Sequence, residues 1–493
     1  MNVVREPVHS LFARCASERP DLEAIVDSKG RSVTYGELDR KSSAFASRLL
    51  DFGLGRGERV AFVAYNSIEL VESFLGAMKS GASAVLIDPA TMAEDLEYQL
   101  SDSSPRVILV DSVVLSREQK VLRGFDGAVL INLDGDGPGR VHSYRQLAEG
   151  LAAAELPKID PERDVAVILY YAGVVGRTEQ VLHSHAGIAA CLHMTIRALG
   201  DIRGETTLLT APFTHVLGLT HAMSYLSAHG RVAMIEKKGA PFDATEALSF
   251  MKRVGVKTVW GAPTLFKALL DAAASFQDEL PSLRYCVSGG GYLPPDLQRE
   301  FVAKFRCPLV QAYGLTEGLI VTMQPLEESD AVGTIGRPFP GVDVRVIKED
   351  GTPALSGEVG ELYVRSPCLM MGYSDPSDTA MALSEGWLRT GDLVLYDERG
   401  LFYFVGVKKR MIKYKGYPVF PRDLEEILKR HPAVERALVV GEPDPEVGER
   451  PVARVVLKRE YVGRVSPEEL MEFVNRKVAA YKKLRAVTFV EAL

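Results

Sequence analysis

The chain has 493 residues, which is too long for one hydrophobic core, so we expect two or more domains. Its composition is ordinary, with 46% apolar and 25% charged residues and a formal net charge of -7, and this balance argues against nucleic acid or an anionic membrane surface as a partner. The sequence has no apolar run of transmembrane length and no signal-peptide core, so we expect a cytoplasmic protein without a membrane span. The five cysteines form no C-x-x-C pair, which indicates reduced thiols and no metal site.

The first part of the chain alternates helix-like segments with short β-branched runs, a pattern typical of a parallel sheet with helices on its faces. The helix-like segments cover residues 36–50 and 67–79, and the strand-like runs cover residues 59–64, 84–87, 107–110 and 128–131. A second series follows between residues 165 and 313. Its strands are expected at 231–235, 258–260, 284–287 and 309–313, and its helices at 243–254, from 263 and near 294. The sequence therefore predicts an α/β fold with two doubly wound sheets.

After Pro325 the pattern changes to short alternating strands separated by Gly and Pro turns, at residues 342–347, 360–365, 392–396 and 401–405. This pattern predicts a small antiparallel β unit. From Lys408 onward we expect helices at 422–429 and 467–479 and strands at 437–440, 452–457 and 486–490. We therefore predict a large N-terminal domain over residues 1–407 and a small α+β C-terminal domain over residues 408–493.

The segment from Ile168 to His185 contains two glycines, and on its own it would be an ordinary strand, turn and strand. It reads Ile-Leu-Tyr-Tyr-Ala-Gly-Val-Val-Gly-Arg-Thr-Glu-Gln-Val-Leu-His-Ser-His. This pattern resembles the phosphate loop of the AMP-forming ligase (adenylate-forming, ANL) superfamily, which includes acyl-CoA and aryl-CoA ligases, luciferases and the adenylation domains of peptide synthetases. Gly173, Gly176, Val181 and His185 fit the frame of that loop.

The same segment departs from the family at the positions that contact phosphate. Val174 and Val175 stand where the family has hydroxyl residues, and Glu179 stands where it has a lysine. A triphosphate is held by backbone N–H groups, hydroxyls and an ammonium group. The loss of that ammonium forfeits about 1.5–3 kcal/mol, or a factor of about 10–100 in affinity. We therefore expect this loop to bind phosphate less well than the family's loop does.

Four further motifs follow in the family's order and with intervals like the family's, so the resemblance covers nearly the whole chain. They are Pro212-Phe213-Thr214-His215, Ser288-Gly289-Gly290-Gly291, Tyr313-Gly314-Leu315-Thr316-Glu317 and Thr390-Gly391-Asp392. Each motif alone has an ordinary structural interpretation, such as a core histidine, a strand end or a turn. Their concordance is what indicates the family.

The resemblance implies a nucleotide site built from these motifs. It implies that Tyr313 stacks on adenine, that Thr316 meets the α-phosphate and that Glu317 holds Mg²⁺. It also implies that Asp392 accepts the ribose hydroxyls. The backbone of Gly289, Gly290 and Gly291 would lie along the adenine and the acyl carboxylate, with Gly314 beside Tyr313.

The resemblance also implies an acyl pocket. His215, Trp260, Gly261 and Tyr313 would border it, together with the glycine turn. These side chains would suit an aryl or medium acyl chain, although the same composition would suit a plain hydrophobic core. The sequence does not say which acid is used, or whether the acceptor is a thiol or an amine.

The basic segment from residue 406 to residue 417 resembles the hinge of the family. Lys409 fits the hinge position, whereas Val407 replaces an arginine that usually contacts the nucleotide. Lys413 and Gly416 fit the face presented to the thiol acceptor, and a solvated basic hairpin would explain the same residues. In the family a catalytic lysine follows the segment that ends here at Leu493, which leaves open whether the chain was shortened or natively lacks that lysine.

These observations predict an acid–thiol ligase-like enzyme that activates a carboxylic acid as acyl-adenylate and passes it to coenzyme A or a similar acceptor. The implied cofactors are ATP/AMP, Mg²⁺ and coenzyme A, and Arg177 could compensate for the altered loop. Two alternatives remain open at this point. One is an adenylation-deficient enzyme that only transfers an acyl group from a preformed acyl-adenylate, and the other is a non-catalytic protein that binds a nucleotide, an acyl metabolite or a partner protein. The sequence is compatible with a homodimer.

Overall fold

The computed structural model describes residues 5–91, 93–150, 155–171, 179–236, 238–276, 279–326, 328, 331–414, 417–444, 447–478 and 482–493. The chain forms two compact units. The first comprises Met1–Val344 and Val364–Leu388, and the second comprises Arg345–Tyr363 and Arg389–Leu493. The predicted domain boundary at residues 407 and 408 stays a prediction.

The first unit contains an eight-stranded sheet in the order β19-β9-β8-β4-β3-β5-β6-β7. Six neighbouring strands, from β8 to β7, are parallel, while β9 and β19 are antiparallel. The strands are β3 (Arg59–Val63), β4 (Ser83–Leu86), β5 (Val107–Val110), β6 (Val129–Asn132), β7 (His142–Ser143), β8 (Val165–Tyr171), β9 (Glu179–Ser184) and β19 (Gly372–Tyr373). The sheet contains the four strands predicted for the first series as β3, β4, β5 and β6. It also contains β8 and β9, so the second series begins later than the predicted residue 165.

The first four helices of this unit are α1 (Val8–Glu18), α2 (Tyr35–Asp51), α3 (Ile68–Ser80) and α4 (Ala93–Ser103). Two of them, α2 and α3, are bounded by capping residues. Thr34 caps α2 through a capping box with Glu37, which satisfies N–H groups that have no partner inside the helix. Gly81 ends α3 in the left-handed conformation that glycine adopts without strain.

A nine-stranded sheet in the order β16-β15-β14-β13-β12-β10-β11-β1-β2 completes the first unit. Its six central strands are parallel and its edge strands are antiparallel. The strands are β1 (Glu23–Asp27), β2 (Ser32–Thr34), β10 (Thr206–Leu209), β11 (Arg231–Met234), β12 (Val256–Gly261), β13 (Tyr285–Ser288), β14 (Leu309–Leu315), β15 (Leu319–Met323) and β16 (Arg337–Pro338). The expectation of two doubly wound sheets is confirmed.

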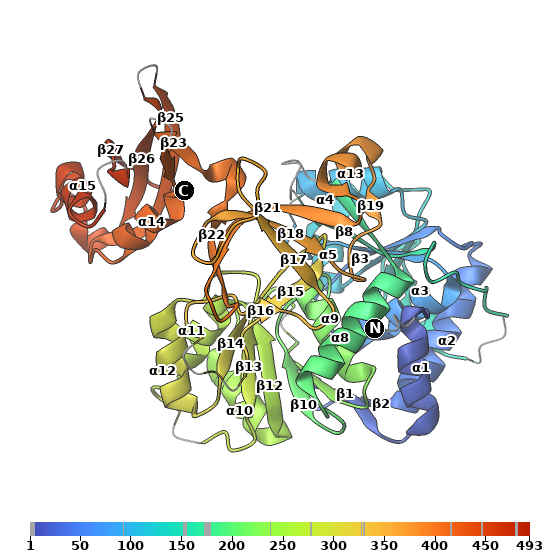
Figure 1. The fold of residues 1–493 in the computed structure, drawn as a ribbon. Helices are drawn as coiled ribbons and strands as arrows, with labels where there is room; N and C mark the ends of the chain where they lie inside the picture. The colour runs from blue at the N-terminus through green and yellow to red at the C-terminus, as the bar shows by residue number, and fades with distance from the viewer. Residues whose placement is uncertain are drawn as a thin grey trace. The chain divides into compact units, whose positions relative to one another are not determined.

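Helices cover both faces of the central strands of this sheet. Figure 1 shows α10 (Ala244–Val254), α11 (Pro263–Ala272) and α12 (Pro295–Phe305) on one side of the strands, and α8 (His185–Leu199) and α9 (Val216–Leu226) on the other. Apolar residues of α10, α11 and α12 form one core cluster with the strands. Asp243 caps α10, the helix predicted at residues 243–254, because its carboxylate accepts from the N–H groups of Thr245 and Glu246.

A five-stranded sheet follows in the chain, with the order β17-β18-β21-β20 and with β22 beside β21. Its strands are β17 (Asp343–Ile347), β18 (Gly360–Arg365), β20 (Leu383–Ser384), β21 (Trp387–Tyr396) and β22 (Phe402–Val407). Strand β21 pairs antiparallel with both β20 and β22. The small β unit predicted after Pro325 therefore exists.

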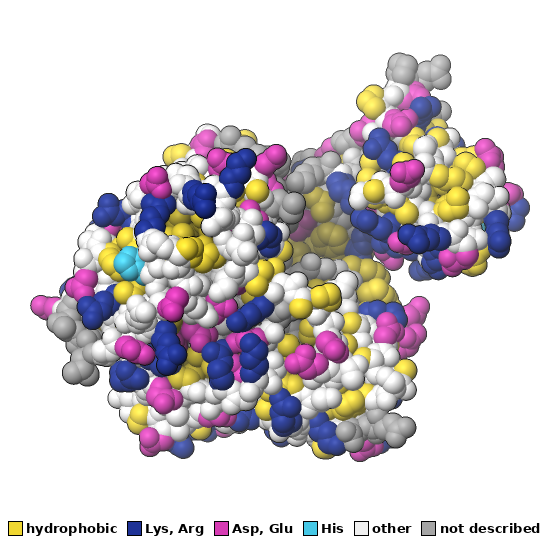
Figure 2. Space-filling view, turned by 180° about the vertical axis from the view of Figure 1, so that it is seen from behind, with side chains coloured by type: hydrophobic (Ala, Val, Ile, Leu, Met, Phe, Trp, Pro, Cys, Tyr) yellow, Lys and Arg dark blue, Asp and Glu magenta, His cyan; other side chains and the backbone are white. Residues whose placement is uncertain are grey.

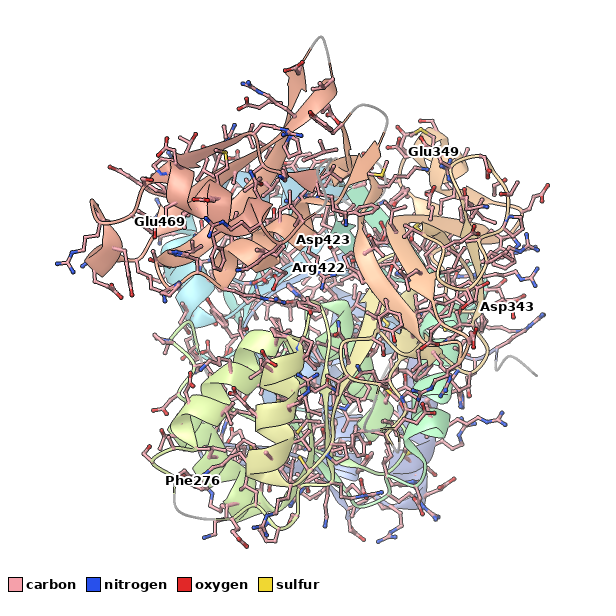
Figure 3. All side chains as sticks on the ribbon, turned by 60° about the vertical axis from the view of Figure 1, so that its left-hand side comes forward. Phe276, Asp343, Glu349, Arg422, Asp423 and Glu469 are labelled. Atoms are coloured by element: carbon pink, nitrogen blue, oxygen red, sulfur yellow. The ribbon has the colours of Figure 1, made fainter. Side chains whose placement is uncertain are left out.

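The last part of the second unit is an α+β fold with the sheet order β24-β23-β26-β25 and with β27 beside β26. Its elements are β23 (Ile412–Tyr414), β24 (Tyr417–Val419), α14 (Pro421–Lys429), β25 (Val434–Asp444), β26 (Gly448–Leu457), α15 (Pro467–Asn475) and β27 (Ala486–Phe489). Arg422 and Asp423, labelled in Figure 3, hold the start of α14: Arg422 Nη1 donates to Phe404 O at 2.9 Å, and Asp423 accepts from Lys482 Nζ at 3.0 Å. Twelve buried apolar residues form its core.

Two elements of this fold differ from the sequence expectation. Strands β25 and β26 are longer than the apolar runs predicted and form one antiparallel hairpin, because backbone pairing continues through charged residues such as Arg450. Helix α15 ends at Asn475, before the predicted residue 479. The Asn475 side chain exchanges two hydrogen bonds with the backbone of Leu484, which turns the chain back toward β27.

The surface and the cysteines agree with the composition. On the face shown in Figure 2, Lys and Arg side chains are interspersed with Asp and Glu side chains. All five cysteines are free and buried. Among the helices that the structure describes, none has both the length and the hydropathy needed to cross a bilayer. Within the described ranges there is also no group of three or more His, Cys, Asp or Glu residues suited to a metal ion.

Candidate functional site

Several predicted site residues lie at the carboxyl edge of the nine-stranded sheet. The register aligns Leu209 of β10, Trp260 of β12 and Val287 of β13, so the residues after these positions meet at one edge. Gly289 N donates to Gly261 O at 3.0 Å, which joins the glycine turn to the end of β12. In an open α/β sheet, this edge is where ligands bind. The structure thus brings Gly261 and the glycine turn together.

The glycine turn is shaped by its backbone and by one glutamine. Gly290 has a φ of +73°, which only glycine adopts without strain. Gln311 Nε2 donates to Gly291 O at 3.2 Å, and Gln311 Oε1 accepts from Leu293 N at 3.3 Å. Gln311 lies in β14, two residues before Tyr313, so the turn and the predicted adenine-stacking ring are attached to the same strand. Tyr313 itself is partly exposed, as a stacking surface requires.

Gly314 occupies a position that no larger residue could take without movement. A Cβ atom there would lie 2.1 Å from Leu319 O, across the hairpin of β14 and β15. We expect Gly314→Ala to cost about 1–3 kcal/mol of folding free energy, because the hairpin must open. We also expect weaker adenylate binding, because Tyr313 moves with the hairpin.

This prediction is checked by thermal unfolding and by adenylate titration. Gly318→Ala is the matched control, since its Cβ would lie 3.1 Å from the Leu315 side chain, which can move. Equal stability and equal affinity in both variants would contradict the prediction.

The Thr316–Glu317 segment is attached to the eight-stranded sheet. His183 Nε2 of β9 donates to Thr316 O at 2.7 Å, so the proton of that imidazole is on Nε2. The hydroxyl of Tyr373 donates to Glu317 Oε1 at 2.7 Å, and Met370 N donates to Glu317 O at 2.8 Å. Glu317 is fully buried. The carboxylate is therefore held in a fixed position between the two sheets of the first unit.

The unusual residues of β9 are packed into the sheet. Glu179 is buried, and its Oε2 accepts from Ser374 Oγ at 3.0 Å. Gln180 Nε2 donates to Asp102 Oδ2 at 2.6 Å, and the hydroxyl of Tyr170 donates to the same oxygen at 2.8 Å. The residues in the family's lysine and glycine positions thus fasten β9 to its neighbours. Val174 and Val175 lie outside the described residues.

His215 is paired with an aspartate from the other sheet of the first unit. His215 Nε2 lies 2.8 Å from Asp88 Oδ2, and half of the His215 side chain is exposed. Asp88 follows β4, and its Oδ1 accepts from Ala90 N at 2.7 Å. Burial alone would raise the pKa of Asp88, but the hydrogen bonds from His215 and Ala90 outweigh it and lower the pKa. Asp88 is therefore a carboxylate at neutral pH.

Trp260 is a buried residue of β12. It is 2% exposed and stacks on His221 of α9, with ring centroids 4.8 Å apart and an interplanar angle of 12°. His221 Nε2 shares a 2.6 Å hydrogen bond with Thr207 Oγ1, and burial lowers the pKa of His221 to about 3. The imidazole is therefore neutral. The role of Trp260 in an acyl pocket stays a prediction.

The remaining predicted residues belong to the second unit. Asp392 lies in β21, where its N–H donates to Thr390 Oγ1 at 3.0 Å, and Thr390 Oγ1 donates to Leu362 O at 2.8 Å. Lys409 falls in a short 3-10 helix (Lys408–Arg410) and Lys413 in β23, but their side chains lie outside what the structure describes. Gly416 lies outside the described residues as well. The roles of these residues stay predictions.

Family models match most of the chain. The AMP-binding enzyme model matches residues 12–374, and the AMP-binding enzyme C-terminal domain model matches residues 423–493. The chain belongs to the AMP-binding enzyme family. The family membership predicted from the motifs is thereby confirmed. The two matched regions of this AMP-binding enzyme also agree with a large N-terminal part followed by a small C-terminal part.

Curated relatives of this AMP-binding enzyme are similar over nearly the whole chain. It is 31% identical to a long-chain-fatty-acid–CoA ligase of Bacillus subtilis (strain 168), over 99% of this chain and 91% of that protein. It is 30% identical to peroxisomal OPC-8:0-CoA ligase 1 of Arabidopsis thaliana, over 98% of this chain and 89% of that protein.

Known structures share its fold. ATP-bound MatB from Rhodopseudomonas palustris superposes with a TM-score of 0.85 at 26% identity, covering 99% of this chain and 96% of that one. A benzoate CoA ligase from Burkholderia xenovorans LB400 superposes with a TM-score of 0.83 at 27% identity, covering 99% and 97%.

Sequence reasoning missed the partners of the motif residues in this AMP-binding enzyme. Asp88, His183, Tyr373 and Ser374 each contact a predicted motif position, yet they come from three separate parts of the chain. One signal was available: parallel strands present their carboxyl ends at one edge, and Asp88 follows such a strand. The edge could have been predicted from the sequence, but the pairing with His215 could not.

Proposed function

We propose that this AMP-binding enzyme joins a carboxylic acid to coenzyme A by way of an acyl-adenylate. The single observation that carries the proposal is the Thr316–Glu317 segment, which hydrogen bonds from His183 and Tyr373 hold in place. A carboxylate attack on the α-phosphate of ATP needs positioning and charge neutralisation more than covalent catalysis. A fixed, buried carboxylate beside a partly exposed Tyr313 supports that requirement.

The described residues fit the groups that the reaction needs. ATP/AMP and coenzyme A follow from the family, and we assign the adenine to Tyr313 and the glycine turn, and the ribose to Asp392. Mg²⁺ commonly binds one or two protein carboxylates and completes its shell with substrate phosphates and water. Glu317 fits this pattern as a lone carboxylate, and the ion would neutralise phosphate charge when bound. Thr316 would donate its hydroxyl to the α-phosphate.

We further propose that the acid has an apolar acyl or aryl tail. Three of the proteins named above are ligases of fatty acids, OPC-8:0 and benzoate, which supports this class. The edge of the predicted pocket agrees, because Leu217 of α9 lies 3.5 Å from where a Gly289 Cβ would be. A thiol acceptor is favoured by the same relatives. Assembly as a homodimer and a cytoplasmic location stay predictions.

One observation supports a second candidate, transfer from a preformed acyl-adenylate without adenylation. Glu179, at the family's lysine position, is buried in a hydrogen bond with Ser374 and contributes no cation. The curated relatives are named as complete ligases, so we place this candidate second.

An assay of the two half-reactions separates these candidates. Purified protein is incubated with MgATP and either dodecanoate or benzoate, and pyrophosphate release is followed with and without coenzyme A. We expect release that depends on the acid, and a thioester only when coenzyme A is present. Thioester formation from a synthetic acyl-adenylate without any pyrophosphate release from the free acid would instead establish the second candidate. If the protein neither releases pyrophosphate nor forms a thioester with any acid tested, the proposal is refuted.

A further inference from the structure

Two side chains that follow strands of the eight-stranded sheet hold His215: one contacts the backbone just before it, and the other contacts its imidazole. Asn66, which follows β3, donates from Nδ2 to Ala211 O at 2.9 Å and accepts from Phe213 N at 2.7 Å. Asp88, which follows β4, is bonded to the His215 ring itself. These contacts fasten the segment before α9 at both ends, so the orientation of the ring is determined by the fold.

The hydrogen bond to Asp88 also determines which ring nitrogen carries the proton. Asp88 is ionised, so the atom that faces it, His215 Nε2, must be a donor. The other nitrogen, Nδ1, is then the ring's proton acceptor whenever the imidazole is neutral. Arg117 also acts on the charge of Asp88. Its Nη2 donates to the backbone of Pro89 and Thr91, and its Nε pairs with Glu118.

The His215–Asp88 pair connects two predicted parts of the site, the glycine turn and the strand that leads into the altered phosphate loop. His215 is two residues before Leu217, which packs toward Gly289 of the glycine turn. Asp88 is two residues beyond Leu86, and Leu86 pairs with Leu169 of β8, the strand that leads into the altered phosphate loop. The half-exposed imidazole thus belongs to the segment that borders the glycine turn.

We propose that His215 is the general base for the acceptor thiol and that Asp88 is its positioning residue. The inference rests on the proposed function. In this step the thiol proton moves to His215 Nδ1, a bond forms between the sulfur and the acyl carbon, and the bond from that carbon to the AMP phosphate oxygen breaks. AMP leaves with the electron pair, and the proton passes from Nδ1 to solvent. A free thiol is only slightly ionised at neutral pH, so a fixed base beside it accelerates attack.

The test follows the thioester half-reaction alone. Synthetic dodecanoyl-adenylate and benzoyl-adenylate are mixed with excess enzyme and coenzyme A, and thioester is measured in a single turnover between pH 5.5 and 9. We expect Asp88→Asn to lower the rate about 10- to 100-fold and to alter the acidic limb of the profile, on which the rate rises as the base loses its proton, because the charge beside the ring is removed. We expect His215→Ala to remove that limb.

Asn66→Ala is the matched control. It loosens the same segment without changing the charge beside the ring, so its rate can fall while its pH limb stays in place. We expect Asp88→Asn to lower pyrophosphate release from the free acid less than it lowers thioester formation, because the dyad acts on the thiol step. An equal fall in both half-reactions, or an unchanged pH limb in both Asp88→Asn and His215→Ala, would overturn the proposal.

A spectroscopic measurement keeps the inference separate from the proposed function. Nitrogen NMR of the imidazole, assigned with His215→Ala, should show the proton on Nε2 in wild type and a larger share of the Nδ1-protonated tautomer in Asp88→Asn, because an amide oxygen is a weaker acceptor than a carboxylate. This signature without any thioester from either adenylate would overturn the catalytic role, whereas pyrophosphate release would still test adenylation. The opposite tautomer would overturn the positioning role of Asp88.

Discussion

Replacing Glu317 with glutamine is expected to lower acid-dependent pyrophosphate release about 100- to 1,000-fold, which is the usual effect of losing one fixed electrostatic stabiliser. The side chain is fully buried and accepts a 2.7 Å hydrogen bond from the hydroxyl of Tyr373. Glutamine has nearly the same shape and keeps an oxygen for that hydroxyl, so the substitution removes the negative charge and little else. The measurement is the initial rate of pyrophosphate release at saturating MgATP and acid.

Tyr373→Phe is the control for this prediction. It keeps the charge of Glu317 but removes one hydrogen bond to a buried carboxylate, which costs about 1–3 kcal/mol of stability. We expect its rate to fall less than that of Glu317→Gln. A Glu317→Gln rate within about threefold of wild type would show that the carboxylate does not act on the reacting phosphates. Equal rates in the two variants would show instead that position matters more than charge.

The sheets could be predicted because local signals agree with the tertiary fold. Asp243 marks the start of α10 as a helix cap, and Pro263 begins α11 at the position where proline lacks only an N–H that has no helical partner. The apolar runs of β5 and β13 coincide with completely buried strands. The predicted lengths of β25 and β26 were too short, because both strands continue through charged residues that pair through their backbone and carry no apolar signal.

In the candidate site, only the motifs that are contiguous in the sequence could be predicted. The Tyr313–Glu317 motif is contiguous, so it is visible in the sequence, and the structure places it at the end of β14. Its partners are not contiguous: Tyr373 and His183 reach it from strands of the other sheet, across sequence separations of 56 and 133 residues. Such contacts depend on how two sheets pack, which no local pattern records. The bond between Asp88 and His215 could not be predicted for the same reason, because it also joins residues from the two sheets.

Acidification to pH 5.5 is expected to destabilise the first unit by about 2–3 kcal/mol relative to pH 7.5. His183, His185 and His221 are fully buried, and burial lowers their pKa values to about 4, about 4 and about 3. Their unfolded pKa is about 6.5, so below that pH the unfolded chain binds protons that the folded protein does not. Stability is therefore complete above pH 6.5 and is lost as the pH falls toward 4.

The loss from three imidazoles is about 4 kcal/mol at pH 5.5, since each pH unit below 6.5 is worth about 1.4 kcal/mol per group. Glu72 acts in the opposite direction, because burial raises its pKa to about 7 and the folded protein gains its proton first, which offsets about 2 kcal/mol. His9, beside His185, adds to the loss, since its pKa is lowered to about 3, mainly by burial. The balance therefore still favours unfolding in acid.

Denaturant unfolding at pH 7.5 and pH 5.5 checks this balance, followed by tryptophan fluorescence. Both tryptophans, Trp260 and Trp387, belong to the first unit, so the signal reports that unit. His183→Asn should weaken the dependence of the unfolding free energy on pH, because one proton-binding difference is removed, whereas His142→Asn should not, because His142 is exposed. A wild-type midpoint that does not change between the two pH values, together with a His183→Asn variant that behaves in the same way, would mean that His183 is protonated in the folded state. In that case the hydrogen bond from His183 to Thr316 O would carry a charge into the site, and the negative charge at Glu317 would be partly neutralised before any metal ion binds.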